Sequence, residues 1–216
     1  MSTEPGAAHL TDLVLQGIAT SFDRPFVQGG KVLMMKSGCV DASLRSDTSV
    51  RLLLDHDEKH CLATSDDRLE LYAGTRGLAF RYRLPDRASE FKFSEIADDM
   101  ESYAPVSIGY TATKKDNYII DGVTVTCVVE AKLCELSILS RPPAVHATYA
   151  RVVSLDSCGS LKNDYETGRL ELVGKVISLH RDFKASENGG VIKYSHFSSP
   201  YDLAASRFER ALQNLA

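Results

Sequence analysis

Three short apolar stretches of this sequence each contain a polar residue that packing alone would not select. His56 follows the apolar run VRLLL, Ser107 lies inside APVSIGYTAT, and Glu135 lies in the middle of LCELSIL. A carboxylate within an apolar strand is costly unless it is paired. A hydroxyl, an imidazole and a carboxylate together supply a nucleophile, a general base and a group that orients the base. The residues therefore predict Ser107 as nucleophile, His56 as base and Glu135 as the orienting acid.

Each of these residues also has a purely structural explanation. A serine in a strand commonly hydrogen-bonds to a nearby carbonyl group, and His56 could be an ordinary loop histidine. Glu135 could face solvent on an edge strand, with Cys134 and Leu136 taking the buried face. Composition and periodicity do not decide between the two interpretations, whereas the order of the segments along the chain does.

A metal site is a separate hypothesis. His56 and His60 would share one face if this segment were helical, and with Asp57 they could ligate zinc. The general base of the zinc-protease motif is missing, because position 57 is aspartate and no glutamate follows His56. Neither a phosphate-binding glycine loop nor a dinucleotide fingerprint is present. We therefore expect neither metal nor cofactor; the alternative, a metal-dependent hydrolase, predicts inhibition by chelators.

The elements that must position these residues are mostly short strands bounded by turn residues. Strands are expected at residues 13–22, 31–35, 50–54, 68–74, 77–84, 104–113, 118–131 and 133–139. The segment 118–131 is expected as a hairpin around Asp121-Gly122, and helical pieces are expected at 38–44 and 93–100. This pattern predicts a mainly β fold with α elements (α+β), as a small, mostly antiparallel barrel or sandwich.

Composition divides the chain into one domain with an appendage. Residues 1–12 are expected to be a flexible N-terminus, 13–153 the main domain and the polar segment 154–168 a linker. Residues 169–216 are expected to form a C-terminal extension, a β-hairpin followed by an amphipathic helix. Its first stretch, LELVGKVISLHRDF, can be laid over LVLQGIATSFDRPF near the N-terminus, as a partial repeat or as an unrelated hairpin.

The overall composition excludes several classes of protein. Of 216 residues, 44% are apolar, which is enough for a sizeable core, and the net charge of −4 lacks the basic excess of a non-specific nucleic-acid binder. No apolar run is long enough to span a membrane, and the N-terminus does not read as a secretory signal. The five cysteines form no C-x-x-C pair, which indicates thiols in a reducing compartment, and the cytoplasm as location.

The ordered motifs resemble the prohead (capsid maturation) protease family of tailed phages. That family combines an apolar strand leading to His-Asp, a Ser-Ile-Gly-aromatic strand, and a Leu-x-Glu-x-Ser strand ending in Pro-Ala. The corresponding strings here are LLLDHD, VSIGY and LCELSILSRPPA. His56 precedes Ser107 by 51 residues and Ser107 precedes Glu135 by 28, spacings that suit the family. The resemblance covers about residues 13–150.

The resemblance implies a serine endopeptidase with a fold similar to herpesvirus assemblin, a small antiparallel β-barrel flanked by helices. By position, Ser107 matches the family nucleophile, His56 its base and Glu135 its conserved acid. Herpesvirus relatives use a second histidine as the third member, so His146 is the competing candidate.

Two positions depart from the family pattern: residue 55 is aspartate where the family often has asparagine, and Arg141 precedes the usual Pro-Ala. The Arg141 guanidinium is a candidate for stabilising the oxyanion, with capping of a strand end as the alternative. Gly109 is expected to allow close approach of the substrate backbone.

The function implied is head maturation inside the assembling procapsid, in the host cytoplasm. Expected substrates are the scaffolding segment of the major capsid protein, portal-associated head proteins and the protease itself, and a weak homodimer is expected by analogy with assemblin. Neither a nucleic-acid nor a membrane partner is expected. The alternative is a non-catalytic capsid-assembly or scaffolding factor that keeps the protease fold and binds through residues 155–216.

Overall fold

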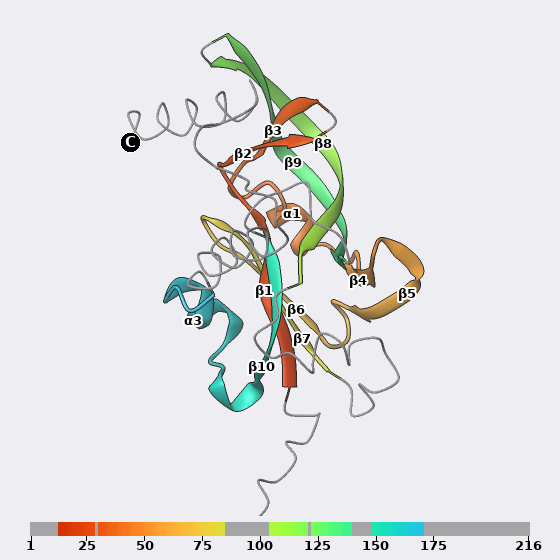
Figure 1. Ribbon diagram of the computed structural model, residues 1–216. Coiled ribbons are helices and arrows are strands. Elements are labelled where there is room, and N and C mark those ends of the chain that lie inside the picture. Colours follow the sequence, from red (N-terminus) through yellow and green to blue (C-terminus); the bar gives the residue numbers. More distant parts are fainter. Residues whose placement is uncertain (1–12, 29, 85–103, 121, 140–147, 171–216) are drawn as a thin grey trace, which may run out of the picture.

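The fold was analysed in a computed structural model that describes residues 13–28, 30–84, 104–120, 122–139 and 148–170 (Figure 1). In this part of the chain strands predominate and the helices are short, which confirms the predicted mainly β fold with α elements. The strands form two sheets. The predicted helix at 93–100 and most of the C-terminal extension, from residue 171 onward, lie outside the described residues. In the described part, no helix combines the length and apolar character needed to cross a bilayer.

The first sheet has four antiparallel strands. Their spatial order is β10 (Tyr149–Ser154), β1 (Leu13–Ser21), β7 (Gly77–Arg83) and β6 (Leu69–Ala73). Nearly every residue of β1 is buried, because one face of the sheet packs on the main core and the other face is covered by a short helix. This burial on both faces explains why β1 begins with the consecutive apolar residues Leu13 to Leu15 and shows no regular alternation of apolar and polar residues.

The second sheet is built around one long strand, and it positions the predicted site. Its path is β2 (Pro25–Gln28), β3 (Lys31–Met35), β9 (Val123–Ile138), β4 (Arg51–Leu54) and β5 (Asp57–Thr64), with β8 (Val106–Ile120) paired to β9. Because β8 pairs along the whole of β9, the two strands β3 and β4 share the opposite edge. Both run parallel to β9.

The β8–β9 hairpin corrects the predicted strand boundaries. Its turn contains Gly122 at φ 78°, as the Asp-Gly dipeptide predicts. The segments 118–131 and 133–139, however, do not form separate elements: β9 runs through both as a single strand. No turn residue separates them. The strand β8 pairs along the whole of β9, while on the other edge β3 pairs with Val125–Val128 and β4 with Glu135–Ile138.

The predicted small antiparallel barrel is not observed. Among the described residues both sheets have open edges, and the two parallel pairs on β9 break the expected antiparallel order. One isolated bridge, Ala104 to Ala150, links the edge of the first sheet to the residues just before β8. The sheets therefore pack on each other with a shared core, and this bridge joins them (Figure 1).

The shared core covers one face of the second sheet. Leu52 of β4, Val106 of β8 and Leu136 of β9 point into the core, where they meet Leu15 and Phe80 of the first sheet. Side chains alternate between the faces of a strand, so the residues next to these apolar ones point to the opposite side.

The segment expected as a linker, 154–168, contains two short helices, η3 (Leu155–Ser157) and α3 (Leu161–Glu166). The helix α3 lies beside the first sheet (Figure 1). A buried ion pair holds it there: Arg81 of β7 contacts Asp164 at 2.7 Å, and the two side chains are 3% and 2% exposed. The Arg81 guanidinium also donates to the side chain of Gln16 and to the carbonyl of Gly159.

Replacing Asp164 with alanine should leave the Arg81 guanidinium buried without its carboxylate. We expect the free energy of unfolding to fall by about 3–5 kcal/mol, measured by urea denaturation of the full chain. The control is Lys162→Ala, which removes an exposed pair with Glu166 in the same helix and should change stability by less than about 1 kcal/mol. Equal unfolding midpoints for the two variants would contradict this role of the ion pair.

Candidate active site

The structure brings two of the three predicted residues into direct contact. His56 Nδ1 lies 2.5 Å from Glu135 Oε1, across 79 positions of sequence. The histidine side chain is 45% exposed and the glutamate side chain 13%. An ionised carboxylate only accepts hydrogen bonds, so the contact assigns the proton to Nδ1 and leaves Nε2 with a lone pair. An imidazole held in this tautomer can take a proton from a hydroxyl.

His56 is placed by the tight turn between β4 and β5. Leu54 pairs with Asp57, and the two residues between them have positive φ, 50° for Asp55 and 62° for His56. This is the pattern of a type I′ hairpin turn, which aspartate tolerates better than most residues. The Asp55 amide donates to the Ile138 carbonyl at 2.8 Å, so the turn stays bound to the end of β9.

Ser107 lies on the same face of the sheet as Glu135. In the β8–β9 ladder Ser107 is paired with Ser137, and Gly109 with Glu135. Directly paired residues of an antiparallel ladder point to the same side, with Cβ atoms about 4.5–5.5 Å apart. Ser107 is half-buried and stands on the strand beside the one that carries Glu135. The face therefore presents a hydroxyl, a carboxylate and the imidazole that the carboxylate holds.

Within the described ranges, the hydroxyl of Ser107 makes no hydrogen bond to His56 or Glu135. Catalytic hydrogen bonds are often long in the absence of substrate and tighten when the substrate binds.

Gly109 makes room for the carboxylate. A Cβ atom at this position would lie 2.4 Å from Glu135 Cγ and 2.8 Å from Oε1, closer than packed atoms can approach. The sequence predicted that Gly109 leaves space for a substrate backbone. In the structure that space is occupied by the side chain that holds His56.

Two serines that sequence reasoning did not assign support this arrangement. Ser137 Oγ accepts a hydrogen bond from the His56 amide at 3.2 Å. Ser43, in the short helix α1 (Asp41–Leu44), accepts one from the Leu133 amide at 2.9 Å. There β9 has one extra residue, Cys134, between partners of Gly109 and Tyr110. Such bulges turn the strand locally and re-aim the residues that follow.

The signals for these two serines in the sequence differ. Ser137 stands two residues after Glu135 in LCELSIL, the spacing of neighbours on one face of a strand. Ser43 lies 90 residues from Leu133 and carries no such signal.

Two further candidates lie outside the described residues. These are His146, the alternative third member, and Arg141, the candidate oxyanion group. Both therefore remain predictions.

The metal hypothesis assumed a helix at His56 and His60, but this segment is a turn followed by the strand β5. His60 Nδ1 instead contacts Asp57 Oδ2 at 2.7 Å. Two hydrogen bonds hold the pKa of the Asp57 carboxyl below its ordinary value: the larger effect comes from the Lys59 backbone N–H and the next from the His60 side chain. In the described part of the chain, no three His, Cys, Asp or Glu side chains gather as metal ligands would.

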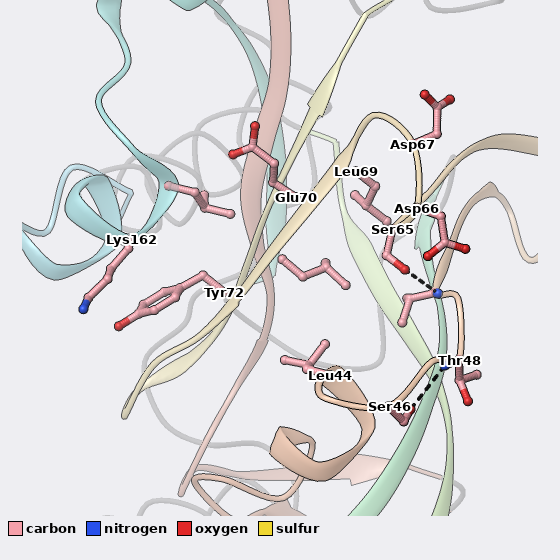
Figure 2. A pocket seen from close by; sticks show the side chains of 13 residues that line it. Leu44, Ser46, Thr48, Ser65, Asp66, Asp67, Leu69, Glu70, Tyr72 and Lys162 are labelled. Carbon is pink, nitrogen blue, oxygen red and sulfur yellow. Dashed lines mark hydrogen bonds between the residues drawn. The ribbon is translucent and has the colours of Figure 1, made fainter.

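A pocket of about 610 Å³ lies beside the edge strand β6 (Figure 2). Leu71 and Tyr72 of β6, Leu44 of α1 and Lys162 of α3 contribute to its wall. Of the candidate residues that the structure describes, His56, Ser107 and Glu135, none lines this pocket.

Comparison with known proteins adds one finding. The family model described as caudovirus prohead serine protease matches residues 3–162 of this chain. The match contains all three motifs that carry the candidate site. No curated protein matches the sequence.

Replacing Gly109 with alanine should displace the Glu135 side chain and break its hydrogen bond to His56. We expect the downfield proton NMR signal of His56 Nδ1–H to disappear while the circular dichroism spectrum is retained. In a Glu135→Ala background the new methyl group has room, so the same substitution should have little further effect on stability. An unchanged Nδ1–H signal in Gly109→Ala would show that Glu135 does not need this space.

Proposed function

Since this chain belongs to the caudovirus prohead serine protease family, we propose that it is an active serine endopeptidase of phage head maturation, with Ser107 as nucleophile. The observation that carries the proposal is the hydrogen bond between His56 Nδ1 and Glu135 Oε1 on the sheet face that also bears Ser107. A histidine held by a carboxylate near a serine is the arrangement that activates a hydroxyl for acyl transfer.

In the proposed mechanism His56 Nε2 takes the proton of Ser107 as the serine Oγ attacks the peptide carbonyl carbon. The Glu135 carboxylate, shielded from most solvent, stabilises the imidazolium that forms. The tetrahedral intermediate collapses when the C–N bond breaks, and the imidazolium gives its proton to the leaving amine. A water molecule, deprotonated by His56, then hydrolyses the ester and restores the serine.

The third member and the oxyanion group are assigned by the same proposal. Glu135 is the third member because it holds Nδ1 directly; His146 is the competing residue. Arg141 follows β9 by three positions and is the proposed oxyanion group. A fold relationship to assemblin and a weak homodimer belong to the proposal as well, and they rest on family resemblance.

Capsid proteins are the substrate class that the family implies. We assign to this chain the scaffolding segment of the major capsid protein, portal-associated head proteins and self-cleavage, all within the procapsid assembling in the host cell. Residues 13–153 would form the protease domain, and residues 169–216 an extension beyond it.

A fluorophosphonate probe tests the nucleophile, because it reacts with activated serines. We expect labelling at Ser107 in the wild-type chain and none in Ser107→Ala. His56→Ala should label about 10²–10⁴-fold more slowly, since the general base is lost. Ser157→Ala, at an exposed serine on η3, is the matched control and should label as wild type does.

Two results would overturn the proposal. One is labelling of Ser107→Ala at the wild-type rate, which would place the reactive group elsewhere. The other is Ser107→Ala supporting head maturation as well as wild type does, which would show a non-catalytic assembly factor. Loss of activity on adding a chelator would indicate metal-dependent hydrolysis.

A further inference from the structure

We infer that Ser137 is a positioning residue for the His56 base, a role that rests on the proposed function. Its side chain is fully buried, and its Oγ accepts a hydrogen bond from the His56 amide at 3.2 Å. A buried hydroxyl is costly unless it is hydrogen-bonded. The bond to the His56 amide satisfies this hydroxyl at its buried position between Leu136 and Ile138.

The turn that carries His56 needs external support. Asp55 and His56 both adopt positive φ, which costs free energy in residues other than glycine and persists only where the surroundings impose it. Two consecutive amides supply that support from β9: Asp55 N–H donates to the Ile138 carbonyl, and His56 N–H donates to Ser137 Oγ. Of these two partners, only the serine hydroxyl can be removed by substitution.

The same strand also holds the imidazole. Glu135 and Ser137 are two positions apart and therefore point to the same face of β9. Glu135 binds the ring of His56 through Nδ1, while Ser137 binds its backbone amide. With both ends attached to one strand, the ring has little freedom to rotate, and the position of Nε2 is set by β9.

The attachment of the His56 turn to β9 matters for the reaction because the proposed nucleophile stands on the neighbouring strand. Ser107 is the cross-strand partner of Ser137. The residue that holds the base in place is thus the nearest neighbour of the nucleophile in the ladder. A shift of the turn by about 1 Å would move Nε2 relative to the Ser107 hydroxyl, and misplacement of that size can cost about 10²-fold in rate.

The chain offers a matched control at the other end of β4. Ser65 Oγ accepts a hydrogen bond from the Val50 amide at 2.9 Å, the same kind of contact made just before β4 begins (Figure 2). Ser65→Ala removes one serine-to-amide bond from this strand without touching the His56 turn. A purely structural role for Ser137 predicts similar behaviour of the two variants.

The experiment compares full-length wild type, Ser137→Ala, Ser137→Thr and Ser65→Ala under conditions in which each is folded. The readouts are the rate of fluorophosphonate labelling at Ser107 and the downfield proton NMR signal of His56 Nδ1–H. We expect Ser137→Ala to label about 10–100-fold more slowly and to lose or broaden the NMR signal. Ser65→Ala should label within about twofold of wild type, and Ser137→Thr, which retains the hydroxyl, should recover most of the rate. If Ser137→Ala does not fold, Ser137→Cys replaces it, with similar volume and a weaker acceptor.

Wild-type labelling and NMR signal in Ser137→Ala would overturn the inference, as would equal slowing in Ser137→Ala and Ser65→Ala. Failure of the proposed function is distinguishable, because the wild-type chain itself would then not be labelled at Ser107. In that case the NMR signal still decides whether Ser137 fixes the turn that carries the His56 ring.

Discussion

The candidate site depends on one hydrogen bond, between His56 Nδ1 and Glu135 Oε1. It requires two segments 79 residues apart to meet in a fixed orientation, and the parallel pairing of β4 with the end of β9 brings them together. Leu54 lies beside Ile138, so the turn after β4 begins where β9 ends. The turn then folds back over the strand, and the imidazole reaches the carboxylate.

The second sheet can hold this hydrogen bond because one of its faces packs on the core while the other carries the candidate site. One face supplies Leu52, Val106 and Leu136 to the core, and their burial stabilises the strands that carry the site. The other face carries Ser107 and Glu135. Ser107 and Glu135 therefore stand on strands, and His56 lies in the short turn that follows β4, so the candidate groups are held by regular structure, an arrangement that favours precise positioning.

Small backbone features adapt the sheet to this task. Gly109 lacks the side chain that would collide with Glu135, and the extra residue at Cys134 changes the pairing just before that glutamate. The positive φ of His56 belongs to the tight turn from which its ring contacts Glu135. Departures from regular strand geometry thus gather around one hydrogen bond, which is typical of sites where local strain is maintained by the surrounding structure.

The sequence alone determined the mainly β fold, most strand positions, the Asp-Gly turn and the family, because these follow from local patterns and ordered motifs. It also identified His56 and Glu135. Only the tertiary structure decided the parallel pairing of β3 and β4 with β9, the two open sheets in place of the predicted barrel in the described residues, and the turn conformation at His56. It also revealed the contacts of Ser43 and Ser137. Strand partners and the bonds of isolated serines depend on residues about 80 or 90 positions away, and local sequence carries no record of which distant segment will lie alongside.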